Sequence, residues 1–219
     1  MTKLNSIDLT AKLLATENLT VVRVNAQTAS FDVATRILYL PVWKDMTPEI
    51  ESMLVLHEVG HALFTPLKEW MEALEHIDQY KAVIHGYMNV IEDARIEKLM
   101  KRRYPGSRKN FNAGYVELLE RDFFRLKGKD LPSMKLIDRI NLYFKGGVTL
   151  GITFTPEEKA FVNRVERCET IDEVISLSKE IFEFSKSEVI SRENGLNTND
   201  IEYDIAEELE LEDEEFEDE

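Results

Sequence analysis

The most constraining feature of this chain is a pair of histidines, His57 and His61, in a segment with helix signals at both ends. Thr47-Pro48 is typical of a helix start, and Thr65-Pro66 is typical of a helix end. Because an α-helix completes a turn every 3.6 residues, side chains four positions apart lie on one face. We therefore predict a helix over 48–64 whose two imidazoles can converge on one point.

The residues around these histidines point to a bound metal ion. In the pattern His57-Glu58-x-x-His61, both imidazoles can ligate Zn²⁺, and Glu58 can take a proton from a water molecule at the ion. The histidines continue the apolar face of the predicted helix, whose members are Ile50, Met53, Leu54 and Phe64. Buried imidazoles need polar partners, and one metal ion would satisfy both, although two ordinary helix histidines are the alternative. Gly60 lets another backbone or a substrate come close.

A catalytic zinc site usually has a third protein ligand, and a second predicted helix, over 81–103, offers candidates. Glu92 falls on the apolar face of this helix, so its carboxylate must be paired or metal-bound. We take Glu92 as the third ligand and Asp93 as the alternative. The remaining histidines, His76 and His85, are further candidates.

Two acidic residues of the same helix, Asp93 and Glu97, lie four positions apart on a different face from Glu92. They can accept hydrogen bonds that orient a ligating imidazole, or they can form a solvated edge. Arg95 is a candidate to anchor one of these carboxylates. Taken alone, the acidic cluster would be interpreted as a surface salt-bridge pattern with Arg95 and Lys98.

Two runs of this sequence resemble a known family. They are Leu56-His-Glu-Val-Gly-His-Ala-Leu-Phe64, and Asn89-x-x-Glu92-Asp93-Ala-Arg95-x-Glu97 followed by Pro105-Gly106. Together they look like the metallopeptidase-like domain of the cobaltochelatase T-subunit group, within the HExxH zincins that have a glutamate third ligand (gluzincin-like). The resemblance covers residues 19–106. It implies His57, His61 and Glu92 as zinc ligands and Glu58 as general base.

Several members of that group continue through an acidic linker into a von Willebrand A-type domain. Here the sequence becomes acidic and then ends, so we expect that second domain to be absent. This expectation favours a stand-alone enzyme or a fragment over a role in a chelatase.

The sequence predicts an α+β fold with one mainly helical domain over 1–190. The segments rich in β-branched and aromatic residues predict three short, mostly antiparallel strands, over 19–24, 30–33 and 36–41, after a short helix over 7–16. Apolar residues at helical spacing predict later helices over 114–127, 134–144, 156–167 and 171–187. We place the sheet and the His57–His61 helix in 1–106 and a helical subdomain in 107–190.

The segment 34–38 is a candidate edge strand that binds an extended peptide substrate by adding it to the sheet. An ordinary small sheet that covers the helix is the equal alternative. A donor for the oxyanion of the reaction is also needed, and the candidates are Tyr80, His85, Tyr87 and Tyr104.

Charge is concentrated in the last part of the chain. The formal net charge is −15, and residues 202–219 hold twelve acidic residues and no basic ones. We expect 191–219 to be a disordered acidic tail that keeps the protein soluble or docks on a basic protein partner. The overall acidity argues against nucleic-acid binding by Lys101-Arg102-Arg103. A single cysteine, Cys168, and no long apolar run favour a cytoplasmic location, or the host cytoplasm for a viral protein, with no membrane partner.

These observations predict a zinc-dependent peptide-bond hydrolase with a peptide or protein substrate. The main alternative is a catalytically silent zincin-like scaffold that binds metal and acts as an assembly or interaction module. A third possibility is a metal-free helical interaction protein whose acidic tail recruits a basic partner.

Overall fold

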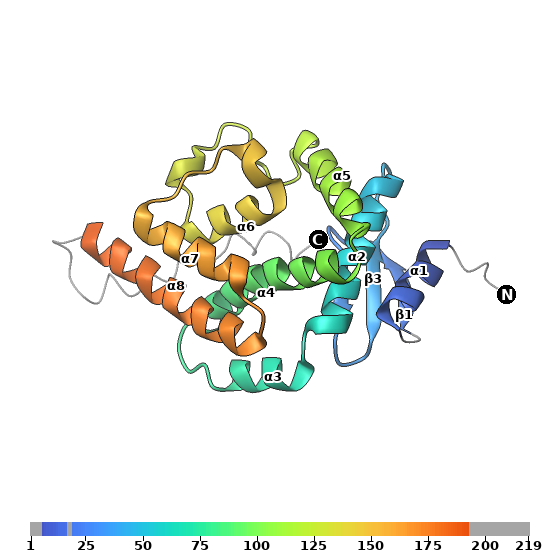
Figure 1. The fold of residues 1–219 in the computed structure, drawn as a ribbon, viewed down its shortest axis with the longest axis horizontal. Coiled ribbons are helices and arrows are strands. Elements are labelled where there is room, and N and C mark those ends of the chain that lie inside the picture. Colours follow the sequence, from blue (N-terminus) through green and yellow to red (C-terminus); the bar gives the residue numbers. More distant parts are fainter. Residues whose placement is uncertain (1–5, 17–18, 193–219) are drawn as a thin grey trace. The chain divides into compact units, whose positions relative to one another are not determined.

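The computed structural model describes residues 6–16 and 19–192. The chain divides into two compact units, each made of two segments. The first unit comprises Met1–Leu67 and Ile96–Lys129, and the second comprises Lys68–Arg95 and Asp130–Glu219, within the described residues. This division differs from the contiguous boundary expected at residue 106. One helix, α4 (Lys81–Arg103), labelled in Figure 1, contributes residues to both units.

The first unit contains a three-stranded sheet. Its strands are β1 (Thr20–Val24), β2 (Ser30–Asp32) and β3 (Ile37–Pro41), in the order β1-β3-β2. β3 pairs in parallel with β1 and antiparallel with β2, so the sheet is mixed and the expectation of mostly antiparallel strands is wrong. A tight turn joins β2 to β3. β1 and β3 are paired although β2 lies between them in the sequence.

The candidate substrate-binding edge at 34–38 is also wrong. Residues 34–36 belong to the turn, and Ile37 and Leu38 belong to β3, which is the central strand with partners on both sides. A strand whose backbone groups are paired on both sides cannot accept a further strand. Among the described strands, the edges are those of β1 and β2.

Helices complete the first unit: α1 (Ser6–Ala15), α2 (Pro48–Phe64), the last residues of α4, and α5 (Ser107–Glu120). α2 packs against α1 and α5 and lies beside β2 and β3. The helix begins and ends where the sequence predicts, because Thr47 accepts a hydrogen bond from the Ile50 N–H and Thr65 ends it in extended conformation. The buried side chains of the core include Leu38, Ile50, Met53, Val59 and Phe111.

The α5 helix corrects the prediction of a helix over 114–127. It spans Ser107–Glu120 and ends before Asp122, which has a φ of 54°. Gly114 therefore lies inside the helix, where a Cβ atom would stand 2.4 Å from the Met53 Cβ. The glycine serves the close packing of α5 on α2 rather than the start of a helix.

The second unit is helical. It consists of α3 (Leu67–Glu75), the first part of α4, α6 (Leu136–Gly146), α7 (Pro156–Arg167) and α8 (Ile171–Arg192), with short 3₁₀ turns at Leu131–Ser133 and Gly147–Leu150. α7 and α8 pack side by side (Figure 1). Helix α3 was not predicted from the sequence. The predicted starts of α7 and α8 are confirmed, since the capping boxes of Thr155 with Glu158 and of Thr170 with Glu173 both form.

Only Ser191 and Arg192 of the expected acidic tail are described, and both belong to α8. The rest of 191–219 lies outside the described residues. In the part of the chain that the structure covers, no helix combines the length and apolarity that crossing a membrane requires.

Candidate metal centre

Helix α2 brings the two predicted histidine ligands together. The rings of His57 and His61 have their centroids 5.0 Å apart and meet edge to face at 73°. Both side chains are half-buried. This arrangement follows from the four-residue spacing on one helix, as the sequence predicts.

The His57 ring is held by a buried carboxylate from α4. Nδ1 of His57 lies 3.1 Å from Oε1 of Glu97, which is only 3% exposed. Of the two sequence-based interpretations of Glu97, the hydrogen-bond acceptor is therefore right and the solvated edge is wrong. A carboxylate in this position accepts the Nδ1 proton, so the lone pair of a neutral imidazole would be on Nε2.

The His61 ring has a matching partner within its own helix. Its Nδ1 atom lies 3.0 Å from the hydroxyl oxygen of Thr65, the residue that ends α2. Donation from Nδ1 to this hydroxyl would again leave Nε2 as the metal-binding atom. The same ring nitrogen thus engages a protein partner in both histidines, which is the pattern of imidazoles that ligate a metal through the other nitrogen.

The environment keeps Glu97 ionised. Burial by itself would raise the pKa of this carboxyl group. The hydrogen bond with His57 and the charge of Lys101 outweigh that effect and lower the pKa to about 2. Lys101, one turn further along α4, donates to Oε2 at 2.8 Å, and the Tyr115 hydroxyl of α5 donates to Oε1.

Asp93 is a candidate for the third ligand. One ligand atom from each of His57, His61 and Asp93 lies within 4.8 Å of the other two, so these residues could share a metal ion. Asp93 precedes Glu97 by one turn on the same helix, and Glu97 contacts His57. Asp93 also forms an ion pair with Lys145 of α6 at 3.2 Å, which a metal ion would have to compete with.

Glu92, the third ligand taken from the sequence, is fully buried as expected. Both of its carboxylate oxygens accept hydrogen bonds from the Arg95 guanidinium at 2.7 Å. The residue that Arg95 anchors is therefore Glu92, whereas the sequence analysis expected Asp93 or Glu97. The pair is buried, so the interpretation of Arg95 as part of a surface salt-bridge pattern is wrong. The assignment of Glu92 as a ligand stays a prediction, and the grouping of ligand atoms favours its alternative, Asp93.

The other two histidines have different surroundings. His76 is exposed and its Nδ1 lies 2.6 Å from the Glu72 carbonyl oxygen. The His85 ring packs edge to face on Trp70, with centroids 5.7 Å apart. Within the described residues, neither belongs to a group of three potential ligands.

Gly60 permits the close approach of α4 to α2. A Cβ atom at this position would stand 2.7 Å from Cδ1 of Ile96, the residue before Glu97. The sequence predicted a close neighbour here, and the neighbour is a side chain of α4 rather than a backbone or a substrate. Glu58, the predicted general base, is 4% exposed on the same helix.

A further residue at the end of α2 escaped the sequence analysis. The Arg36 guanidinium donates to the carbonyl oxygen of Ala62 at 2.7 Å, next to His61, and lies 4.7 Å from the centre of the Phe31 ring. The backbone of Arg36 is left-handed, with a φ of 59°. An arginine in a turn carries no sequence signal for such a contact, because the partner lies 26 positions away.

The candidate oxyanion donors among the tyrosines have different surroundings. Tyr87 is fully buried beside Phe182 in the core of the second unit, and burial raises its pKa to about 12. Tyr104 donates its hydroxyl proton to the carbonyl oxygen of Leu14 at 3.0 Å. The Tyr80 ring also packs on Phe182. These contacts leave the oxyanion donor unassigned.

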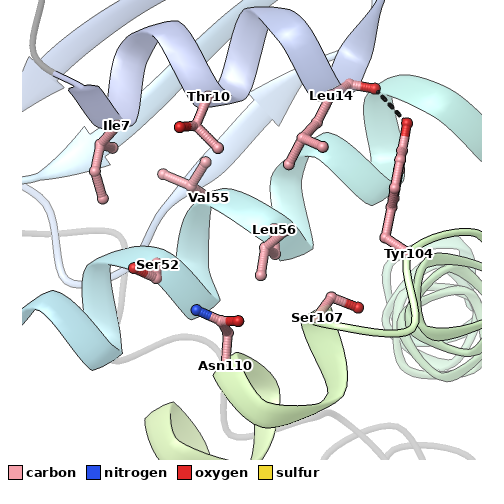
Figure 2. Close-up of a pocket in the computed structure, with 9 residues that line it drawn as sticks. All are labelled: Ile7, Thr10, Leu14, Ser52, Val55, Leu56, Tyr104, Ser107 and Asn110. Carbon is pink, nitrogen blue, oxygen red and sulfur yellow. Dashed lines mark hydrogen bonds between the residues drawn. The ribbon is translucent and has the colours of Figure 1, made fainter.

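The first unit also contains a cavity of about 310 Å³ (Figure 2). It is lined by Ile7, Thr10, Leu14, Ser52, Val55, Leu56, Tyr104, Ser107 and Asn110. Helical periodicity places Ser52, Val55 and Leu56 on the opposite side of α2 from the two histidines. The cavity is therefore separate from the candidate metal centre.

We compared the chain with protein-family models, with curated proteins and with solved structures, and none of the three comparisons found a match.

Proposed function

We propose that this protein is a zinc-dependent hydrolase that cuts peptide bonds. The observation that carries the proposal is the histidine pair of α2, in which Glu97 fixes Nδ1 of His57 and Thr65 contacts Nδ1 of His61. Two ordinary helix histidines would not each need a hydrogen-bond partner at Nδ1. Two imidazoles and a carboxylate form the donor set that zinc prefers in hydrolytic enzymes.

In this proposal His57, His61 and either Asp93 or Glu92 would hold the ion. Bound zinc would polarise the scissile carbonyl and make water more acidic. Glu58 would then take the proton of the attacking water and pass it to the leaving amine. The buried position of Glu58 supports this role, because electrostatic interactions with a base are stronger where bulk water is excluded.

The resemblance to HExxH zincins of the cobaltochelatase T-subunit group supports the same function. For an extended substrate, β2 is the better candidate than residues 34–38, because β2 is an edge strand beside α2. The proposed enzyme would act in the cytoplasm on a peptide or protein substrate, with the acidic tail as a contact for a basic partner.

The substitution Glu58→Gln tests this proposal. The variant should bind zinc as the wild type does and lose at least about 100-fold in turnover of a mixed peptide library, because an amide cannot act as a base. Glu51→Gln is the matched control, since Glu51 lies on the same helix and pairs with Arg23 near the surface. A Glu58→Gln variant with full peptidase activity would refute the assignment.

A metal-binding module without catalysis is the second candidate. The ion pairs of Asp93 with Lys145 and of Glu92 with Arg95 favour it over a hydrolase, because a carboxylate with a cationic partner is a poorer third ligand and a catalytic zinc site usually has three. Zinc binding without cleavage of any peptide in the library would support this candidate. A chain that binds no metal would instead support a helical interaction protein.

A further inference from the structure

The buried carboxylate beside His57 is fixed by more than its contact with the imidazole. Oε1 of Glu97 accepts a hydrogen bond from the Tyr115 hydroxyl, and Oε2 accepts one from Lys101 at 2.8 Å. Both oxygens of the carboxylate therefore have a donor besides His57. With all of these donors in place, the carboxylate has little freedom to rotate.

Helix α5 contributes to both of these contacts. It supplies Tyr115 directly, and the ring of Phe111, one turn earlier, lies under the Lys101 ammonium group at 4.6 Å. The rings of Phe111 and Tyr115 are themselves stacked, with centroids 6.4 Å apart. Phe111 is 1% exposed and Tyr115 is 6% exposed, so this arrangement belongs to the packed core.

The Tyr115 hydroxyl has a definite chemical role in this arrangement. A carboxylate is only an acceptor, so the tyrosine must donate its proton to Oε1. His57 must donate to the same oxygen atom from Nδ1. Because two donors converge on Oε1, the carboxylate has one orientation and holds the His57 ring in one orientation. This contact selects the neutral imidazole form with its proton on Nδ1 and its lone pair on Nε2.

We propose that Tyr115 and Lys101 are positioning residues for the metal ligand His57 and act through Glu97. This inference rests on the proposed function, because it assumes that Nε2 of His57 binds the metal. Neither residue touches the metal or the substrate. Their effect is to keep one orientation and one tautomer of His57 before the ion arrives, which lowers the cost of forming the site.

The substitution Tyr115→Phe removes the hydroxyl and keeps the ring. We expect zinc affinity, measured by competition with a chelator, to fall about 10-fold, the lower end of the range for residues that orient a ligand. We also expect ¹⁵N NMR of the metal-free variant to show His57 as a mixture of tautomers, where the wild type shows the Nδ1–H form. Tyr104→Phe is the matched control, because it removes a hydroxyl bonded to Leu14 in the same unit and should change neither quantity.

Lys101→Met provides an independent test if Tyr115→Phe does not fold. This variant keeps an unbranched chain over Phe111 and loses the donor to Oε2, so its zinc affinity should also fall. Wild-type zinc affinity together with a single His57 tautomer in either folded variant would overturn the proposal. A wild-type protein that binds no zinc would refute the proposed function instead, and the tautomer of metal-free His57 would still test the roles of Tyr115 and Lys101.

Discussion

The imidazole of His57 on α2 and the carboxylate of Glu97 on α4 face each other at 3.1 Å, and the carboxylate is almost completely buried. A buried carboxylate is costly unless its charge is compensated. Here hydrogen bonds and the charge of Lys101 compensate it, so the contact has the chemistry of a carboxylate that orients a metal-ligating histidine.

The substitution Glu97→Gln should weaken zinc binding about 10- to 100-fold, because an amide is a poorer acceptor for the Nδ1 proton. Titration calorimetry with zinc measures the change. Glu120→Gln, at the exposed end of α5, is the control and should bind like the wild type. Equal affinities for Glu97→Gln and the control would show that the contact does not support the metal.

Acid should destabilise the protein through Glu97. The pKa of this group is about 2 in the folded protein and near the ordinary value of 4.5 when unfolded. The contribution of Glu97 to the free energy of unfolding is thus complete above pH 4.5. It is lost as the pH falls from 4.5 towards 2, on the order of 3 kcal/mol in total. Urea denaturation of wild type and Glu97→Gln at pH 7, 4 and 3 isolates this contribution. We expect the difference in unfolding free energy between the two proteins to narrow on acidification. A constant difference would show that the ionised Glu97 carboxylate does not stabilise the fold.

The two glycines at helix contacts should respond differently to alanine. Gly114→Ala should lower the free energy of unfolding by about 2–3 kcal/mol, because the new methyl group meets the Met53 Cβ and the Glu49 carbonyl oxygen. Gly60→Ala should cost about 1 kcal/mol, because the nearest atom is the end of the Ile96 side chain. Chemical denaturation measures the free energy of unfolding of both variants and of the wild type. A stabilised Gly114→Ala variant would show that α2 and α5 do not pack this closely.

The ion pairs of the second unit offer a test of burial. Arg139 pairs with Glu158, both under 10% exposed, and also donates to the carbonyl oxygen of Thr153. Arg139→Met should cost about 3–5 kcal/mol, because it leaves the Glu158 carboxylate buried without this partner. Arg164→Met, in the exposed pair with Glu180, should cost at most about 1 kcal/mol. Thermal unfolding ranks the two variants, and similar losses would contradict the burial of Arg139.

The sequence predicts the parts of this structure that depend on local interactions. The bounds of α2 follow from Thr47 and Thr65, whose effects reach only one turn. The starts of α7 and α8 follow from capping boxes for the same reason. The pairing of His57 with His61 needs only helical periodicity.

Interactions between distant segments could not be predicted in the same way. The parallel pairing of β1 with β3 depends on where the chain returns after β2, which strand composition does not encode. Glu92 and Asp93 are neighbours that differ by about 100° around α4, so a small error in the orientation of the helix exchanges their roles. Tyr115 donates to a carboxylate 18 positions earlier, and nothing in its own segment indicates that contact.

The zinc content of the purified protein, after equilibration with zinc and removal of the free ion, decides whether His57 and His61 hold a metal ion. We expect one zinc ion per chain by elemental analysis, and none in a variant with both His57→Ala and His61→Ala. A wild-type protein that keeps no zinc, or a double variant that keeps as much as the wild type, would contradict this expectation.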